Sequence, residues 1–157
     1  MNKKEVYTIE EVKRKLERYC VYQDRCHKEV EDKLREYKLI PQAREAILLH
    51  LFEHNFINEE RFSKSFARGK YRIKKWGRLR IVRELKFRQI SEYNIKTALK
   101  EIDQEVYTSN LYSLTEKKNE LIKTTNIYER KKKLYAYLTY RGYEPNLIYE
   151  AIESYIN

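Results

Sequence analysis

Apolar residues recur along this chain with the period of an α-helix, and the same pattern returns about every fifty residues. Three sets of six positions carry it: Leu34, Leu39, Arg44, Ile47, Leu48 and Leu51; Leu85, Ile90, Ile95, Ala98, Leu99 and Ile102; Leu138, Tyr143, Ile148, Ala151, Ile152 and Tyr155. In each set the last four positions follow the i, i+3, i+4, i+7 spacing that marks one face of a helix. Only Arg44 interrupts the apolar series. Self-similarity at this period predicts a tandem-repeat protein.

A short break separates two helices within each repeat. The three breaks lie at residues 38–41, 89–91 and 142–145. Pro41 and Pro145 end two of them, and proline suits the start of a helix, where its missing N–H would have no partner.

Capping signals mark other helix starts. Thr8 stands three residues before Glu11, and Asn126 three residues before Glu129, which is the spacing of a capping box. Asn58 precedes two acidic residues, a further signal for the start of a helix.

The pattern predicts an all-α fold of three tandem three-helix repeats, with units at residues 8–56, 57–103 and 104–157. A three-helix unit of about fifty residues buries little alone, so we expect the units to stack into an elongated, curved array. Composition agrees, because 3 Gly and 2 Pro are too few for the turns of an all-β sandwich.

No apolar run approaches the roughly 20 residues of a membrane span, and residues 1–7 lack the apolar stretch of a signal peptide. We therefore expect a cytoplasmic monomer with no membrane partner. Cys20 and Cys26 would then be thiols that serve as small apolar side chains.

Positive charge is concentrated in one segment. The net charge is +10, and the stretch from Arg61 to Arg88 holds 12 of the 34 basic residues but only one acid, Glu84. Like charges at i, i+4 repel each other, and solvated helix faces usually mix signs. This segment therefore favours an anionic partner.

The helical period assigns faces within this segment. The basic row Arg61, Lys64, Arg68, Arg72 and Lys75 falls in an arc of about 80° on one helix. The neighbouring arc, predicted to face the core, contains Phe62, Phe66, Gly69, Ile73 and Trp76. In the next helix we expect Leu79, Val82 and Leu85 to point inward and Arg80, Arg83 and Phe87 outward.

The candidate binding residues combine this segment with a second basic cluster, 130–133, which opens a predicted helix where the dipole disfavours cations. They are Arg61, Lys64, Arg68, Arg72, Lys75, Arg78, Arg80, Arg83, Lys131, Lys132 and Lys133.

Patterns of catalysis and metal binding are weak. His50, Glu53 and His54 spell H-x-x-E-H, the inverted zinc-protease signature, but a protease fold would need a third ligand and a larger chain. Cys26 and His27 with the other two histidines would supply four zinc ligands, yet tight C-x-x-C pairs are missing. No glycine-rich phosphate loop or Ser–His–Asp pattern is present. We expect neither an enzyme nor a cofactor or metal ion.

Specific motifs resemble those of the RecX family over essentially the whole chain. They are Phe56-Ile57-Asn58-Glu59-Glu60-Arg61-Phe62-Ser63, Lys75-Trp76-Gly77-Arg78-Leu79-Arg80-Ile81 with Glu84-Leu85-Lys86, and Leu16-Glu17-Arg18-Tyr19-Cys20 with Cys26-His27-Lys28-Glu29-Val30. The resemblance implies a bacterial cytoplasmic modulator of the RecA recombinase. Family members are tandem three-helix repeats that bind in the groove of RecA–single-stranded DNA filaments and restrain recombinase activities.

One departure concerns the turn between the second and third helices, where the family commonly has glycine. Here Lys38 and Gln89 occupy that turn and only Gly142 conforms. A left-handed glutamine costs on the order of 1 kcal/mol, so we expect these two turns to be shaped differently.

Together these features predict a non-catalytic regulatory protein that binds in the groove of the RecA–single-stranded DNA filament. We expect it to modulate, mainly inhibit, recombinase activity in recombination and DNA repair, and to contact single-stranded DNA directly or through the filament. One alternative is a free-standing nucleic-acid-binding helical repeat protein. A third possibility is a structural adaptor for an acidic protein.

Overall fold

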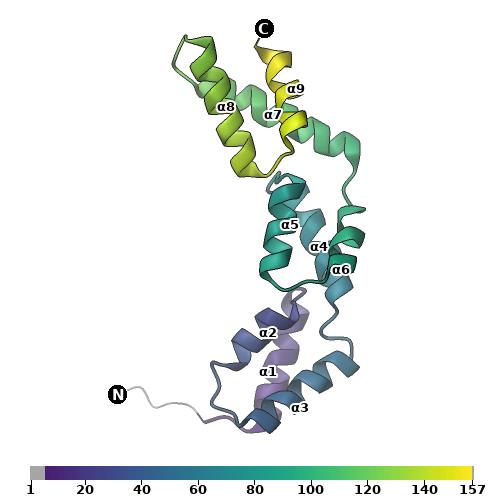
Figure 1. Cartoon of the computed structure of the whole chain (residues 1–157). Coiled ribbons are helices and arrows are strands. Elements are labelled where there is room, and N and C mark those ends of the chain that lie inside the picture. The colour runs from purple at the N-terminus through teal and green to yellow at the C-terminus, as the bar shows by residue number, and fades with distance from the viewer. Residues whose placement is uncertain (1–5, 157) are drawn as a thin grey trace, which may run out of the picture.

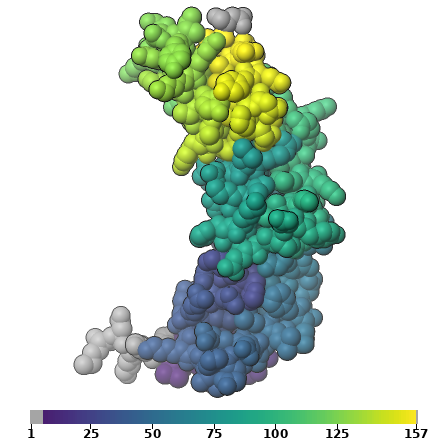
Figure 2. Space-filling view, in the orientation of Figure 1, coloured from purple at the N-terminus to yellow at the C-terminus, as the bar shows by residue number. Residues whose placement is uncertain are grey.

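The computed structural model describes residues 6–156, and within this range the chain forms nine α-helices and no strand. The first unit contains α1 (Ile9–Tyr22), α2 (His27–Leu34) and α3 (Pro41–Glu53); the middle unit contains α4 (Glu59–Arg72), α5 (Arg78–Phe87) and α6 (Glu92–Leu99); the third unit contains α7 (Gln104–Leu121), α8 (Ile127–Arg141) and α9 (Pro145–Tyr155). The units stack end to end into a long, bowed array, with α1 in the unit at one extreme and α9 in the unit at the other (Figures 1 and 2).

This arrangement confirms the predicted all-α fold of three-helix repeats. Helices contact one another mainly within each unit, and α4 also contacts α7 across a unit boundary. We keep residues 8–56, 57–103 and 104–157 as the proposed limits of the units. None of the helices within residues 6–156 is long and apolar enough to cross a bilayer.

The predicted helix starts are confirmed by side-chain caps. Thr8 and Glu11 form a reciprocal capping box at the start of α1. The Asn58 side chain accepts from the N–H of Arg61, and the Asn126 side chain accepts from the N–H of Glu129. Each cap satisfies a backbone donor that the first helical turn leaves without a partner.

The core is divided unevenly among the three units. The first unit has its own cluster, which includes Leu16, Val30 and Leu51, whereas one continuous cluster runs through the middle and third units from Phe62 to Ile156. The middle and third units are therefore joined by shared apolar packing, the dominant stabilising term in folding.

Both cysteines are buried as predicted, although the Cys26 thiol also donates to Glu29 at 3.2 Å. Cys20 and Cys26 are buried free thiols, and burial raises the pKa of Cys20 to about 11 and that of Cys26 to about 12. Cys26 belongs to the core of the middle and third units, although it precedes α2 of the first unit.

Three predicted core positions in the basic segment are wrong. Gly69 faces open space, since a Cβ at this position would meet nothing within 4 Å. Ile73 is 79% exposed and Leu79 is 49% exposed, while Tyr71 and Ile81 are fully buried. The prediction assumed a helix that runs on through Trp76, but α4 ends at Arg72. The apolar stripes of α4 and α5 therefore lie on slightly different faces from those inferred by periodicity alone.

The turns before the third helices show one confirmed expectation and one error. Gly142 and Gln89 are both left-handed, with φ values of 99° and 60°, whereas Lys38 is not. In both left-handed turns an N–H bonds to a carbonyl five residues earlier, from Ile90 to Leu85 and from Tyr143 to Leu138. This bond closes a Schellman-type helix end, so Gln89 accepts a conformation that suits glycine better.

The middle and third units meet where two glycines pack back to back. The N–H of Gly77 donates to the carbonyl of Arg141 at 2.8 Å, and that of Leu79 to the carbonyl of Gly142 at 2.9 Å. A Cβ on Gly77 would overlap the Gly142 backbone, and a Cβ on Gly142 would overlap Arg80. The turn before α5 and the turn before α9 are thereby held against each other (Figure 1).

Replacing Gly142 by alanine should lower the free energy of unfolding by roughly 2–4 kcal/mol, because the left-handed backbone strains an L-residue and the new Cβ meets Arg80. The matched control is Gly69→Ala, where a Cβ would meet nothing within 4 Å. Since Gly69 lies inside α4, that change should stabilise the protein by about 0.5–1 kcal/mol. Urea unfolding followed by circular dichroism measures both, and equal effects would contradict the close glycine contact.

Gln89→Gly should raise the free energy of unfolding by up to about 1 kcal/mol, because glycine adopts φ near 60° without strain. Lys86→Gly, placed inside α5, should instead destabilise by about 1 kcal/mol. Thermal unfolding of the two variants should therefore shift in opposite directions, and a loss of stability in both would show that Gln89 is not strained.

Candidate functional site

The cations of α4 lie on two sides of the helix. Lys64, Arg68 and Arg72 follow one another at i, i+4 and i+8, so they form one stripe along the helix. Lys70 lies about half a turn away, on the side where Phe66 and Trp76 pack. The basic segment is thus a band around the unit rather than a single patch.

Arg61 is held at the joint between the first and middle units. Its Nε donates to Asp24 at 2.8 Å, and its Nη2 donates to the backbone carbonyls of Asn55 and Phe56. A guanidinium held by three acceptors is fixed in place, with its Nη1 as the part left for a ligand. We therefore propose that Arg61 joins the two units.

Arg78 is held in the same way at the next joint. Its guanidinium contacts Glu144 at 3.0 Å and Gln104 at 2.6 Å, and it lies 4.0 Å from the centre of the Tyr107 ring. The Tyr107 hydroxyl accepts from the Arg78 N–H and donates to Glu144 at 2.5 Å. Burial, followed by this bond to Glu144, raises the pKa of Tyr107 and keeps its hydroxyl protonated. These contacts indicate a joining role for Arg78 too.

The stripe on α4 carries weak partners that a ligand can displace. The Lys64 ammonium contacts Glu60 at 2.9 Å, and this hydrogen bond raises the pKa of Lys64. Arg68 lies 3.5 Å from Glu101, and Arg72 donates to the Tyr71 hydroxyl at 2.8 Å. The exposed ion pairs of Lys64 and Arg68 add little stability, since water and salt screen them, and the partner of Arg72 is a neutral hydroxyl. The stripe therefore remains available to an anionic surface.

Lys75 does not extend the α4 stripe as predicted. It lies beyond the end of α4 in a left-handed conformation with φ of 55°, and its carbonyl accepts from the Tyr143 hydroxyl at 2.7 Å. The predicted arc placed it on a helix that has already ended at Arg72. Its backbone contributes to the joint with the third unit.

On the other side of α4, cations gather around Trp76. The ammonium of Lys70 lies 4.7 Å from the centre of this ring and the guanidinium of Arg80 lies 4.1 Å from it, both cation–π distances. Burial, and then the charges of Lys74 and Arg88, lower the pKa of Lys70. Lys70, Lys74, Trp76 and Arg88 were not predicted from the sequence as candidate site residues. A tryptophan interleaved with basic residues was the signal that could have identified this cluster.

Arg83 is the least constrained candidate of the middle unit. It is exposed on α5, and within residues 6–156 its side chain has no hydrogen bond, ion pair or ring contact. Phe87, one turn further along α5, is 68% exposed as predicted.

In the third unit the basic cluster divides. Arg130 donates to the backbone carbonyls of Asn119, Ile122 and Thr124, so its place at a helix start needs no ligand. Among the described residues, the side chains of the three lysines that follow have no hydrogen-bond or ion-pair partner. They are Lys131, Lys132 and Lys133. Lys133 lines a groove between α8 and the end of α7, while Lys131 and Lys132 point elsewhere on α8.

The histidines are engaged in local contacts. His50 lies 3.3 Å from Glu17, the ring of His54 bonds to the His50 carbonyl, and His27 lies 3.1 Å from Glu31. Across residues 6–156, no three His, Cys, Asp or Glu side chains are placed to hold one metal ion. Within this range, Cys26 and the three histidines are therefore not assembled into a four-ligand set.

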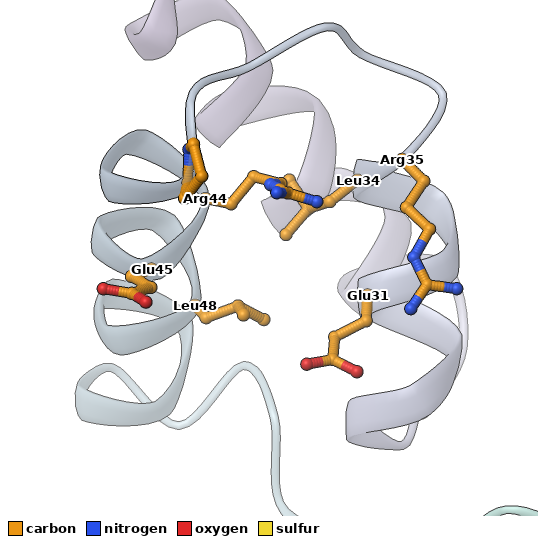
Figure 3. A pocket seen from close by; sticks show the side chains of 7 residues that line it. Glu31, Leu34, Arg35, Arg44, Glu45 and Leu48 are labelled. Carbon is orange, nitrogen blue, oxygen red and sulfur yellow. The ribbon is translucent and has the colours of Figure 1, made fainter.

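Arg44, the polar break in the repeat pattern, lies in a cleft of about 240 Å³ between α2 and α3 (Figure 3). In the other units the equivalent Ile95 and Ile148 are buried. The cleft is lined by two acids, Glu31 and Glu45, as well as by arginines, so its charges balance and it has no preference for an anion.

Arg78→Ala should lower the free energy of unfolding by roughly 1–3 kcal/mol, because it leaves Glu144 without its charged partner at the joint. Arg83→Ala should change it by less than about 0.5 kcal/mol, since no contact is lost. Chemical denaturation of both variants tests this division of the candidate cations. Equal stability of the two would return Arg78 to the set of binding residues.

Family models place these features in a known group. The model for the RecX second three-helix domain matches residues 58–99, and the model for the RecX third three-helix domain matches residues 105–152. Together they cover more than half of the chain, including α4, α5 and α8.

Individual relatives agree with the family models. Regulatory protein RecX of Enterococcus faecalis is 26% identical over 136 residues, which make up 87% of this chain and 51% of that protein. Regulatory protein RecX of Clostridium beijerinckii is 29% identical over 128 residues, which make up 80% of this chain and 59% of that protein. The chain thus spans about half to three-fifths of these curated relatives.

A solved structure shows the same fold. The crystal structure of RecX from Lactobacillus salivarius matches with a TM-score of 0.79 at 23% identity, over 93% of this chain and 95% of that one. A crystal structure of regulatory protein RecX matches with the same score over 73% of its length. The repeat fold, the matched three-helix domains and the relatives together show that this chain belongs to the RecX family.

Proposed function

We propose that this protein binds in the groove of the RecA–single-stranded DNA filament and modulates, mainly inhibits, recombinase activity in recombination and DNA repair. The observation that carries the proposal is the concentration of positive charge on the middle unit of a curved helical array in a RecX family member. In this proposal the protein acts as a cytoplasmic monomer, and it regulates by occupying the filament rather than by catalysis.

The charge of the middle unit suits such a target. A nucleoprotein filament presents phosphates, and a cationic surface gains affinity when it releases the counterions that phosphates collect. Arg68, Arg72 and Arg83 are exposed, and their present partners are weak or lacking among the described residues. They are the cations most available to exchange solvent for phosphate or carboxylate oxygens.

Besides charge, binding along a filament groove is favoured by a defined shape, which the joints between the units provide. The first and middle units are tied by Arg61 and Asp24, and the middle and third units by the glycine contact and Arg78. A bowed array with fixed joints can follow a helical groove without the loss of conformational freedom that a flexible chain would suffer on binding.

The steady-state ATPase rate of the cognate recombinase on single-stranded DNA tests the proposal. The rate should fall as this protein is added at fixed salt, at amounts well below one per recombinase subunit. A rate that stays flat, or falls only when the added protein is enough to coat the DNA, would contradict filament regulation.

Reversing the charge of the α4 stripe should remove this inhibition. Arg68→Glu with Arg72→Glu is the test variant, because both side chains are exposed one helical turn apart. The matched control is Arg14→Glu with Arg18→Glu, an exposed i, i+4 pair on α1 that undergoes the same change of charge. Circular dichroism confirms that both variants fold. Inhibition lost in the control alone would move the binding surface to the first unit.

Salt dependence separates filament regulation from the plain nucleic-acid binder. If strand phosphates are contacted, log affinity should fall with log salt by about 0.7 per contact. A free-standing binder would bind naked DNA tightly and gain nothing from added recombinase. Affinity that rises when the recombinase coats the strand supports the filament as target.

A further inference from the structure

An aromatic and basic strip crosses the joint between the middle and third units. Arg80 lies between two rings. Its guanidinium is 4.1 Å from the ring centre of Trp76, in the turn before α5, and 4.9 Å from the ring centre of Tyr140 on α8. On α8 the strip continues through Tyr137, whose ring centre lies 5.0 Å from the ammonium of Lys118 on α7. Arg80 thus contacts a ring from each unit, and Lys118 contacts a second ring of α8.

The strip leads into a groove between α8 and the end of α7. The groove has a volume of about 600 Å³ and is lined by Lys118, Leu121, Ile122, Lys123, Lys133, Ala136, Tyr137 and Tyr140. Three of these residues are lysines and none is acidic. The local charge is therefore wholly positive, which selects an anionic occupant.

The shape of the groove follows from the sequence of α8. Lys133, Ala136, Tyr137 and Tyr140 stand at i, i+3, i+4 and i+7, so they share one face of the helix. The small side chain of Ala136 leaves the floor open between a lysine and a tyrosine. The stripe is about 10 Å long, which matches about three phosphate spacings of a stacked strand.

We propose that this groove, continued by Arg80 and Trp76, binds single-stranded nucleic acid by stacking bases on Tyr140 and Tyr137 and pairing phosphates with the lysines. Tyr140 is 70% exposed, so its ring is available despite the contact with Arg80. Tyr137 is half-buried, so Tyr140 offers the more accessible ring. Rings and neighbouring cations are the two elements of sequence-independent strand binding. An acidic protein surface would satisfy the lysines but would leave the rings without flat partners.

This site is distinct from the α4 stripe and needs no recombinase. It contributes a direct contact to DNA, whereas the proposed filament regulation can rest on protein contacts alone. If strand binding fails while ATPase inhibition persists, the groove inference falls and the filament proposal stands. If the protein binds the strand but does not inhibit the ATPase, the groove inference stands and the filament proposal falls.

The test compares two labelled oligonucleotides of equal length and charge, oligo(dT) and its abasic counterpart, by fluorescence anisotropy without recombinase. Because stacking requires bases, the wild-type protein should bind oligo(dT) at least about fivefold more tightly than the abasic strand. Equal binding of the two strands would overturn the proposal, since phosphate contacts alone would then account for affinity.

Variants of Tyr140 test whether the preference for oligo(dT) over the abasic strand arises in the groove. Tyr140→Leu should abolish most of the difference between the two strands, while Tyr140→Phe should retain it because the ring remains. The matched control is Tyr93→Leu on α6, which removes a tyrosine that is 74% exposed but lies outside the groove. If Tyr140→Leu keeps the preference for bases, or Tyr93→Leu loses it equally, the groove is not the binding site.

The lysines provide an independent readout. Replacing Lys118, Lys123 and Lys133 together by glutamine should reduce the slope of log affinity against log salt by about 2, at about 0.7 for each lost phosphate contact. Thermal unfolding verifies that the triple variant is folded. An unchanged slope would show that these lysines do not contact the strand.

Discussion

The structure depends most on the close contact between Gly77 and Gly142. Only residues without a Cβ allow the two turns to approach until backbone N–H groups of one donate to carbonyls of the other. That approach brings Tyr107 beside Tyr143 and lets one hydrophobic core run through two units. A repeat array is otherwise a sum of weak neighbour interfaces, so a joint of this kind sets its curvature and stiffness.

The same joint organises the charge around it. Arg78 is bound to Glu144 across the joint, Arg80 is placed between rings from two units, and the Arg141 guanidinium bonds to the carbonyl of Lys74. The basic segment therefore contains two kinds of cation. Some hold units together, and others, such as Arg72 and Arg83, remain on the surface. Net charge describes the segment as a whole, but only the second kind can take a new anionic partner.

Much of the fold was predictable because its signals are local. Capping pairs such as Thr8 with Glu11 act within one helical turn, and the buried positions Ile95 and Ala98 share one face of α6 through the helical period. The end of α4 was not predictable in this way. The chain beyond Arg72 is shaped by contacts with Arg141 and Tyr143, which lie nearly seventy residues further along, so periodicity extended the helix too far.

The positive charge of the candidate site was predictable from the sequence, but the contacts of its side chains were predictable only in part. The basic row on α4 follows from helical spacing, but the partners of Arg61 and Arg78 lie 37 and 66 residues away in sequence. Whether a cation is free depends on such distant partners, which composition does not reveal. The groove on α8 was missed for the same reason, because half of its lining comes from the end of α7.

Electron cryo-microscopy of the recombinase filament on single-stranded DNA, decorated with this protein, tests the central claim most directly. At a resolution that shows side chains, α4 and α5 of the middle unit should face the filament groove, with the Arg68 and Arg72 side chains next to phosphate or acidic oxygens. Density outside the groove, or a middle unit whose α4 and α5 face solvent while another surface makes the contact, would contradict filament binding through the basic segment.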